Sequence, residues 1–346
     1  MRRQQTARAV RFHEFGGVDV LQIDEVEMPT AGSGEVVVEV ITTGINHIEA
    51  FIRAGTLGDD TPTTLPGRQG SDFAGIICEV GHGVTGFRRG DEVLGHVERG
   101  AQATHLAVPV ENLVKKPAAL TWEVAGGLFL AGYVALETLD QLHLGDGDTL
   151  VVSAAAGGVG SMEVQLAKAQ GVRVIGTCGK RNFDYLRQIG ITPVLYGPGI
   201  VDRIRAVAPD GVTAYIDNFG QDGQEIADEL GVDPGRYRSS EHRRELELAA
   251  LTIADDESRR HRTAQLERLA GLAGKRTMNV LISGLYPFDD VRYAFDDLER
   301  MHARGKIVLG TRPVTAYTME KARDQRDESD DAVEAARREQ DESSGD

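Results

Sequence analysis

The sequence predicts an α/β protein with two domains, one rich in β-strands and one built on a parallel sheet. Three observations lead to this prediction. The chain has 346 residues, 41% of them apolar, which is enough to form more than one core. Residues 9–46 alternate apolar and polar side chains between glycines and prolines, as antiparallel strands do. Residues 150–177 read as strand, glycine turn, helix and strand, the order expected of a parallel sheet.

Composition and charge exclude several functional classes. The formal net charge of −16 argues against nucleic acid as a partner, because phosphate backbones bind basic surfaces. No apolar run reaches the roughly 18 residues of a membrane span, and the N-terminus lacks the apolar core of a signal peptide. Cys78 and Cys178 supply neither a disulfide framework nor a four-thiolate zinc site. We therefore expect a cytoplasmic protein without a membrane partner.

The C-terminal stretch has a composition of its own. Residues 319–346 hold 11 acidic and 5 basic residues, and so contribute −6 of the −16 net charge. Almost no large apolar side chain is present to offset the entropy lost on ordering. We predict an acidic, disordered tail over residues 316–346; the alternative is a helix that binds a partner.

The glycine turn predicts a nucleotide site. Residues 150–154 form a short apolar run, and residues 161–170 follow a helical pattern that closes at Gly171. Gly157 and Gly160 permit a tight turn and a close backbone approach, so that a pyrophosphate can lie at the helix N-terminus. Ala155 takes the first position of the G-x-G-x-x-G pattern. This unit predicts a Rossmann domain that binds a dinucleotide; the alternative is an ordinary strand-to-helix turn.

The end of the next strand indicates which dinucleotide binds. An Asp or Glu there would bond the adenosine 2′-hydroxyl and repel a 2′-phosphate, but the residue is Cys178. Gly179, Lys180 and Arg181 follow, and they offer two cations beside a flexible residue. We therefore predict NADPH as the cofactor. The alternative is that both cations only solvate the start of a helix.

Four motifs follow one another along the chain: GEVVVEVITTGINHIEAFIRAG, PGRQGSDFAGIICEVGHGVTGFRRGDEV, AAAGGVG and HARGKIVLG. In this order they resemble the zinc-free quinone oxidoreductase (zeta-crystallin-like) branch of the medium-chain dehydrogenase/reductase superfamily. The resemblance covers about residues 8–200 and 285–310. It implies a GroES-like catalytic domain over residues 1–122 and 286–315, around a Rossmann NADP-binding domain over residues 123–285.

The same superfamily contains zinc alcohol dehydrogenases, in which a catalytic zinc lies in the cleft between the domains. A catalytic zinc takes about three Cys, His or carboxylate ligands. Where those enzymes carry a Cys, a His with Glu, and a second Cys, this chain has Asn46, Ser71 with Asp72, and Gly127. Both thiolates are missing, and we expect no metal site.

The resemblance also implies an activity. Without zinc, hydride transfer from NADPH suits activated acceptors such as quinones and α,β-unsaturated carbonyls. Asn46 is expected beside the nicotinamide, where its amide bonds the acceptor carbonyl; the alternative is that it braces the loop. His47 or solvent would supply the proton, and Glu49 stands where the family usually has Asp. A small-molecule quinone or enone acceptor and a homodimer are implied as partners. The cofactor-binding residues are expected to be Ala155, Gly157, Gly158, Val159, Gly160, Cys178, Lys180, Arg181, Tyr196 and Lys306.

The chain departs from the family after residue 220. The run Asp217-Asn218-Phe219-Gly220 matches a usual strand end, but the glycine-rich turn and strand expected next are missing. Residues 221–277 are polar and mostly helical in pattern, residues 278–286 read as the next sheet strand, and KIVLG reads as the last strand of the β-rich domain. Two other functions therefore stay open: a zinc-free dehydrogenase of hydroxyl groups, and an NADPH-binding protein without catalysis.

Overall fold

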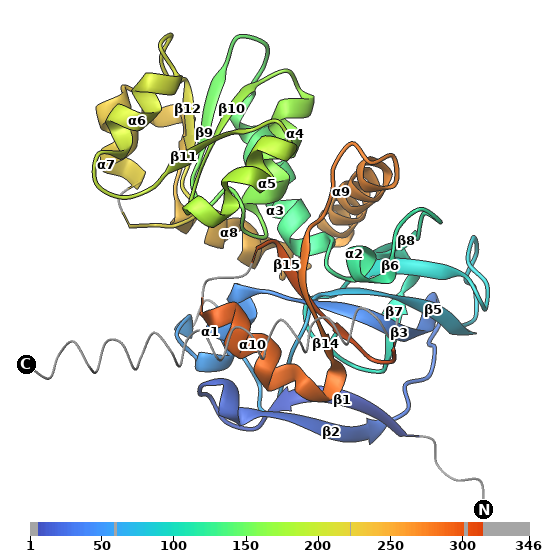
Figure 1. Ribbon diagram of the computed structural model, residues 1–346. Helices are drawn as coiled ribbons and strands as arrows, with labels where there is room; N and C mark the ends of the chain where they lie inside the picture. Colours follow the sequence, from blue (N-terminus) through green and yellow to red (C-terminus); the bar gives the residue numbers. More distant parts are fainter. Residues whose placement is uncertain (1–5, 59–60, 222, 301–303, 314–346) are drawn as a thin grey trace, which may run out of the picture.

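A parallel sheet and a β-rich part form the two halves of the protein, seen here in a computed structural model. The structure describes residues 6–58, 61–221, 223–300 and 304–313. In Figure 1 the parallel sheet and its helices lie in the upper part of the view, and most other strands lie below. The acidic tail predicted over residues 316–346 lies outside the described residues. Within the described ranges, no helix is both long and apolar enough to cross a membrane.

The upper sheet is the Rossmann sheet, with the strand order β11-β10-β9-β12-β13 and parallel pairing throughout. Its strands are β9 (Thr149–Val152), β10 (Arg173–Cys178), β11 (Thr192–Leu195), β12 (Ala214–Ile216) and β13 (Tyr237–Arg238). Leu150 and Val152 pack into one core and Val151 into another, because successive side chains of a strand point to opposite faces. The sheet is therefore buried on both sides, as parallel sheets are.

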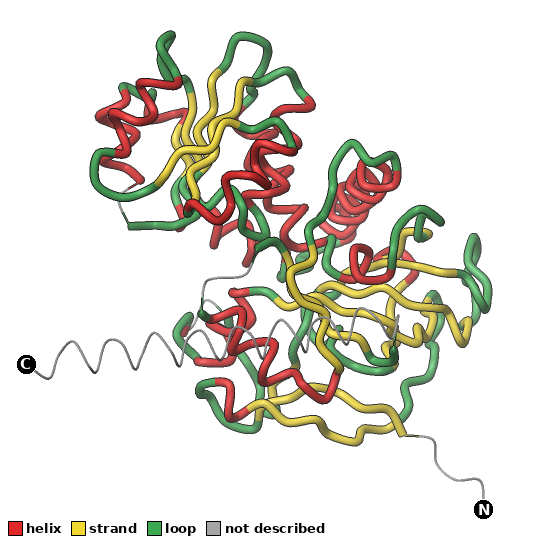
Figure 2. The backbone as a smooth tube through the Cα atoms, viewed as in Figure 1, coloured by secondary structure: helices red, strands yellow, loops and turns green. Residues whose placement is uncertain are grey.

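Helices cover both faces of this sheet, as Figure 2 shows in red. Residues of the first three helices below belong to the core of Leu150, and residues of the last two to the core of Val151. The helices are α3 (Phe129–Leu142), α4 (Gly160–Ala169), α5 (Phe183–Gln188), α6 (Ile200–Val207) and α7 (Gly223–Leu230). Helix α4 ends before Gly171, which has a φ of +86°, as the sequence predicted.

The β-rich part contains a seven-stranded and a three-stranded sheet. The larger sheet has the order β14-β15-β3-β5-β6-β8, with β7 also paired to β3. Its strands are β3 (Glu35–Ile45), β5 (Asp72–Val80), β6 (Glu92–His96), β7 (His105–Pro109), β8 (Leu113–Lys115), β14 (Ile282–Pro287) and β15 (Lys306–Gly310). The smaller sheet joins β1 (Thr6–Phe12), β2 (Leu21–Glu27) and β4 (Gly67–Arg68).

The remaining helices lie where the two halves meet or cover the β-rich part. Helix α1 (His47–Ala54) follows β3 directly, and α10 (Val291–Glu299) packs on α1, β14 and β15. Helix α2 (Trp122–Gly126) packs on β3 and β5. Helices α8 (Ser240–Ala250) and α9 (Asp256–Gly274) both pack on α3, and each also contacts the β-rich part.

The structure differs from the sequence predictions after β12. A short strand, β13, is present where we expected none, although it has only two residues. The strand expected over residues 278–286 is β14, and it pairs in parallel with β15 of the β-rich sheet, so its assignment as the next strand of the Rossmann sheet was wrong. Strand β14 joins this sheet through β15, which pairs antiparallel with β3. KIVLG is thus the last strand of the β-rich part, as predicted.

Candidate functional site

The glycine turn lies at the carboxyl end of β9 and opens directly into α4. Ala154 has a φ of +48°, and a Cβ on Gly160 would lie 2.6 Å from the Ala154 carbonyl oxygen. Only glycine fits position 160 without moving the backbone. The turn brings free backbone N–H groups to the N-terminus of α4, where anions are stabilised. This geometry fits a dinucleotide pyrophosphate.

The same turn touches the β-rich part. Gly157 forms a β-bridge with Gly305, and the Gly305 N–H donates to the Ala156 carbonyl at 2.9 Å. A Cβ on Gly158 would lie 3.2 Å from Cδ of Lys306, so a side chain at position 158 would press on that lysine. The two halves therefore meet at the expected cofactor turn, immediately before Lys306.

A second group of predicted residues surrounds Gly179. Cys178 ends β10 with its thiol buried, and burial raises the pKa of that thiol to about 11. Lys180 is exposed, and no hydrogen bond or ion pair to a described residue engages its ammonium group. Tyr196 is 61% exposed, with its ring 3.7 Å from the place of a Cβ on Gly179. An inert thiol, an unpaired cation and an exposed phenol thus lie together.

Arg304 completes this group, and sequence reasoning missed it. Its Nε donates to Oδ1 of Asn182 at 2.8 Å, and its Nη2 donates to the Arg181 carbonyl at 3.0 Å. The signal was present in the HARGKIVLG motif, but only the tertiary contact places this arginine beside Lys180 and Arg181, 123 residues away from Arg181 in the sequence. Three cations at this edge fit a 2′-phosphate.

A buried polar network lies at the start of α1, and Asn46 is its first member. Asn46 is the N-cap residue of the helix and is 7% exposed. Its backbone N–H and its Nδ2 donate to the two oxygens of Glu49, each at 3.2 Å. Lys306 donates through Nζ to Oδ1 of Asn46 and to the Ile45 carbonyl, the latter at 3.2 Å. Both polar atoms of the Asn46 side chain are therefore engaged within the protein.

Two buried carboxyl groups form the base of this network. Glu49 also accepts from Nε2 of Gln102 at 3.1 Å, and the Ser71 hydroxyl lies 3.2 Å from Glu49 Oε1 and 2.9 Å from Asp72 Oδ1. Burial, followed by the nearby Asp72, raises the pKa of Glu49 to about 7. Burial also raises the pKa of Asp72, against the opposing effect of Lys306. The pair can hold a proton near neutral pH.

These residues do not fit a zinc ion. Positions 46 and 127, where the resemblance expects thiolates in zinc enzymes, hold an amide and a glycine, and Cε of Lys306 lies 3.6 Å from the place of a Cβ on Gly127. The Lys306 ammonium group thus lies next to the residues at positions 46 and 127, where its positive charge would repel a metal cation. Within the part of the chain that the structure describes, no group of three or more His, Cys, Asp or Glu side chains could hold a metal ion.

His47, the predicted partner of Asn46, begins α1 beside this network. Its imidazole is partly buried and forms no hydrogen bond with any described residue. Burial, then the charges of Arg243 and Lys306, lower the pKa of His47 to about 4. A neutral imidazole can donate one N–H and accept at its other nitrogen, but it does not carry the extra proton of an imidazolium.

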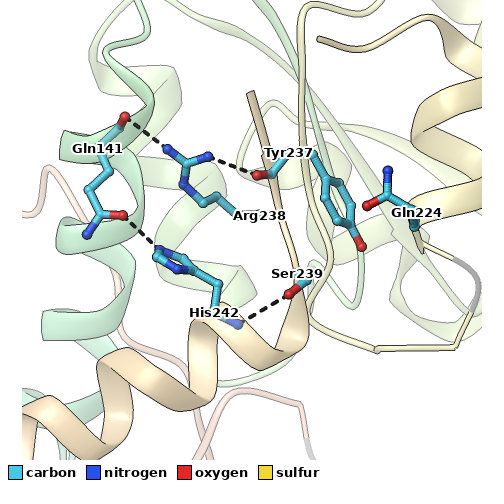
Figure 3. A pocket seen from close by; sticks show the side chains of 6 residues that line it. All are labelled: Gln141, Gln224, Tyr237, Arg238, Ser239 and His242. Carbon is cyan, nitrogen blue, oxygen red and sulfur yellow. Dashed lines mark hydrogen bonds between the residues drawn. The ribbon is translucent and has the colours of Figure 1, made fainter. Parts of the chain in front are cut away.

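A separate polar hollow of about 370 Å³ lies where α3 ends and α8 begins (Figure 3). None of the residues predicted from the sequence line it. In Figure 3, Nε2 of His242 lies 2.7 Å from Oε1 of Gln141, and Nη2 of Arg238 donates to the Gln141 carbonyl at 3.1 Å. The hollow is lined by Gln141, Gln224, Tyr237, Arg238, Ser239 and His242. Its contacts attach the start of α8 to α3.

Comparison with protein families agrees with this architecture. Residues 32–118 match the alcohol dehydrogenase GroES-like domain. Residues 158–232 and 196–309 match two models that are both described as zinc-binding dehydrogenase. The matched segments lie in the β-rich part and in the Rossmann part, in the order that the sequence motifs predicted.

Individual proteins agree as well. Quinone oxidoreductase of Rattus norvegicus is 34% identical over 185 residues, which are 51% of this chain and 54% of that protein. The chain thus aligns with about half the length of this relative. NADPH-dependent alkenal/one oxidoreductase of Arabidopsis thaliana, a chloroplastic protein, is 27% identical over 86% of this chain and 78% of its own length.

Two solved structures share the fold. Quinone oxidoreductase from Coxiella burnetii has a TM-score of 0.73 at 25% identity, covering 89% of this chain and all of that one. A mycobacterial protein solved in complex with NADPH has a TM-score of 0.72 at 27% identity, covering 88% and 99%. With its GroES-like part, its Rossmann sheet and these relatives, the chain belongs to the medium-chain dehydrogenase/reductase superfamily.

Proposed function

We propose that this protein is an NADPH-dependent oxidoreductase that reduces quinones or α,β-unsaturated carbonyl compounds without zinc. One observation carries the proposal: the glycine turn meets Gly305 and Lys306, so the turn that would hold the cofactor pyrophosphate lies next to the Lys306–Asn46 contact. The names of the rat and Arabidopsis relatives support the choice of acceptor. The mycobacterial complex supports the choice of cofactor.

Two groups of residues would hold the cofactor. The turn from Ala155 through Gly157, Gly158 and Val159 to Gly160 would hold the pyrophosphate at the N-terminus of α4. Lys180, Arg181, Arg304 and Tyr196 would hold the 2′-phosphate beside Cys178, since each offers a cation or a hydroxyl there. NADPH, when bound, supplies a hydride.

The protein's own groups would act on the acceptor. Reduction adds one hydride and one proton, which gives a saturated carbonyl from an enone or a hydroquinone from a quinone. Negative charge develops on the acceptor oxygen as the hydride arrives, and preorganised cations and donors lower the cost of that charge. We assign this role to Asn46 and Lys306 together: Asn46 accepts from the ammonium group and so sets its direction. His47 would donate its N–H, and solvent would supply the proton.

Zinc independence is part of the proposal and is supported by the donor set. The Lys306 ammonium group, beside positions 46 and 127, supplies a fixed positive charge. In related enzymes a metal ion supplies such a charge and stabilises an alkoxide. A zinc-free dehydrogenase of hydroxyl groups is the alternative within the same site, and an NADPH-binding protein without turnover is the other.

An acceptor screen tests the proposed function. In separate assays, the protein and NADPH are mixed with a quinone, an enone or an enal. In a further assay, the protein and NADP⁺ are mixed with a simple alcohol. NADPH absorbance is followed in each. We expect NADPH consumption with the quinone or the enone and no NADPH formation from the alcohol. NADPH binding without turnover on any acceptor would favour the non-catalytic alternative. The homodimer and the cytoplasmic location stay proposals, for which sedimentation and cell fractionation are the measurements.

A further inference from the structure

Helix α8 lies between the Rossmann half and α1. It occupies part of the segment that departs from the family pattern, and it packs on both α3 and α1. The guanidinium of Arg244 lies over the ring of Phe51 in α1, 5.3 Å from its centroid. The start of α8 is attached to α3 through His242 and Gln141, as Figure 3 shows. These contacts fix which side chains of α8 face the site.

Arg243 is the side chain of α8 that reaches the junction. Its Nη1 donates to the Asn218 carbonyl at 3.1 Å, at the carboxyl end of β12. Its Nε lies 3.3 Å from Oε1 of Glu247, one turn along α8, and the Glu247 side chain is only 8% exposed. Two residues thus hold the guanidinium in one orientation. Nη2 has no partner among the described residues, and the side chain is 23% exposed.

Arg243 also lies towards the β-rich half, because α8 packs on α1 and the neighbouring Arg244 contacts Phe51, one helical turn after His47. The electrostatics agree: after burial, the charges of Arg243 and Lys306 lower the pKa of the His47 imidazole. Arg243 also opposes the effect of burial on Glu163, a fully buried carboxyl that accepts from Nδ2 of Asn218 at 2.6 Å. The packing of α8 on α1 and the hydrogen bond to Asn218 therefore place Arg243 at the junction of the two halves. Nη2 of Arg243 and the ring nitrogens of His47 have no hydrogen-bond partner among the described residues.

We infer that Arg243 recognises a carboxylate on the acceptor, so that the preferred substrates are enones or quinones bearing an acidic substituent. The inference deepens the proposed function and rests on it. A guanidinium with a free Nη2 presents a planar donor edge that suits a carboxylate, and the neutral His47 ring supplies a second contact. Glu247 holds Nε and leaves this edge open. In a chain of net charge −16, Arg243 would select an anion by this local contact and not by long-range attraction.

A matched pair of acceptors tests this inference. trans-Acetylacrylate and its methyl ester share one enone skeleton and differ in charge. Replacing Arg243 by Gln keeps a donor for the Asn218 carbonyl and removes the cation. We expect Arg243→Gln to lower kcat/KM for acetylacrylate by roughly 10- to 100-fold, the size of one lost charge-assisted contact, and to change the ester by less than about threefold. Arg244→Gln is the control, because Arg244 lies on Phe51, and it should leave both values unchanged.

A binding measurement separates the two proposals. Levulinate, a saturated analogue of acetylacrylate, is titrated by calorimetry into the NADPH complex of each variant. We expect binding to the parent protein and to Arg244→Gln, and weaker binding to Arg243→Gln. Two results would overturn the inference and leave the reductase function standing. One is an equal loss of kcat/KM for acetylacrylate and its ester in Arg243→Gln. The other is an unchanged affinity of Arg243→Gln for levulinate. Levulinate binding that depends on Arg243, without reduction of either enone, would instead overturn the proposed function.

Discussion

Lys306 donates a hydrogen bond through its ammonium group to Oδ1 of Asn46, and the two residues are 260 positions apart in the sequence. They are 4% and 7% exposed, so the contact is shielded from water. Because Oδ1 accepts from the lysine, Nδ2 of Asn46 faces Glu49. Asn46 therefore connects a buried cation to a buried carboxyl group, and its loss should affect both.

Replacing Asn46 by Ala tests whether this connection serves the acceptor. We expect Asn46→Ala to bind NADPH nearly as well as the parent but to reduce an enone roughly 10- to 1,000-fold more slowly, with the loss of an oxyanion donor as the upper guide. A more activated quinone should lose less. Binding is measured by NADPH fluorescence, turnover by absorbance. Lower thermal stability with intact turnover would make Asn46 a loop-bracing residue only.

Cofactor preference should depend on the cations around Gly179. We expect Lys180→Ala combined with Arg181→Ala to weaken NADPH far more than NADH, because each charge-assisted hydrogen bond contributes roughly 1.5–3 kcal/mol. Arg304→Ala should act in the same direction. Arg187→Ala is the matched control, since Arg187 pairs with Asp184 on the outside of α5. Equal losses of both cofactors would contradict the assignment of a 2′-phosphate site.

Stability should vary with pH through Glu49. Its pKa rises from 4.5 to about 7 on folding, so the protonated form favours the folded state. This contribution is complete below about pH 4.5 and is lost as the pH rises towards 7, by up to about 3 kcal/mol. Glu49→Gln should remove it. The free energy of unfolding is measured for the parent and the variant at about pH 4.5 and about pH 7. The difference between the two proteins should change between these pH values, and a constant difference would refute the raised pKa of Glu49.

His47 should titrate well below an ordinary histidine. With a pKa lowered to about 4 by burial, Arg243 and Lys306, the imidazole is neutral throughout the neutral range. NMR titration of the ring protons, assigned with His47→Gln, checks this value. Arg243→Gln should move the pKa upwards because a repelling cation is removed, and Arg244→Gln should not. An unshifted pKa in the parent protein would contradict the burial and charges of this site.

Metal removal should leave the activity in place. We expect protein purified without added zinc and dialysed against a chelator to keep its NADPH-dependent turnover, because Lys306 already supplies a positive charge beside positions 46 and 127. Activity before and after dialysis, and after adding zinc, is the measurement. Turnover that disappears with the chelator and returns with zinc would show that a metal is required.

Local sequence determined the glycine turn between β9 and α4. The strand, glycines and helix over residues 149–169 form where the pattern predicted, because tight turns and helix ends depend on residues within a few positions of each other. The same holds for β10, its end at Cys178 and the cations that follow. The motif order also predicted that KIVLG forms the last strand of the β-rich part, as it does in β15.

Tertiary structure decided the rest of the site. The sequence alone does not reveal that Arg304 lies beside Asn182, that Lys306 bonds Asn46, or that α8 packs on α1, because these contacts join residues more than 100 positions apart. The sheet predicted for β14 was wrong for the same reason. Its apolar pattern predicted a strand, but the sheet that the strand joins is decided by its pairing with β15. Local propensity specifies elements, whereas contacts between distant side chains exist only after the two halves have packed together.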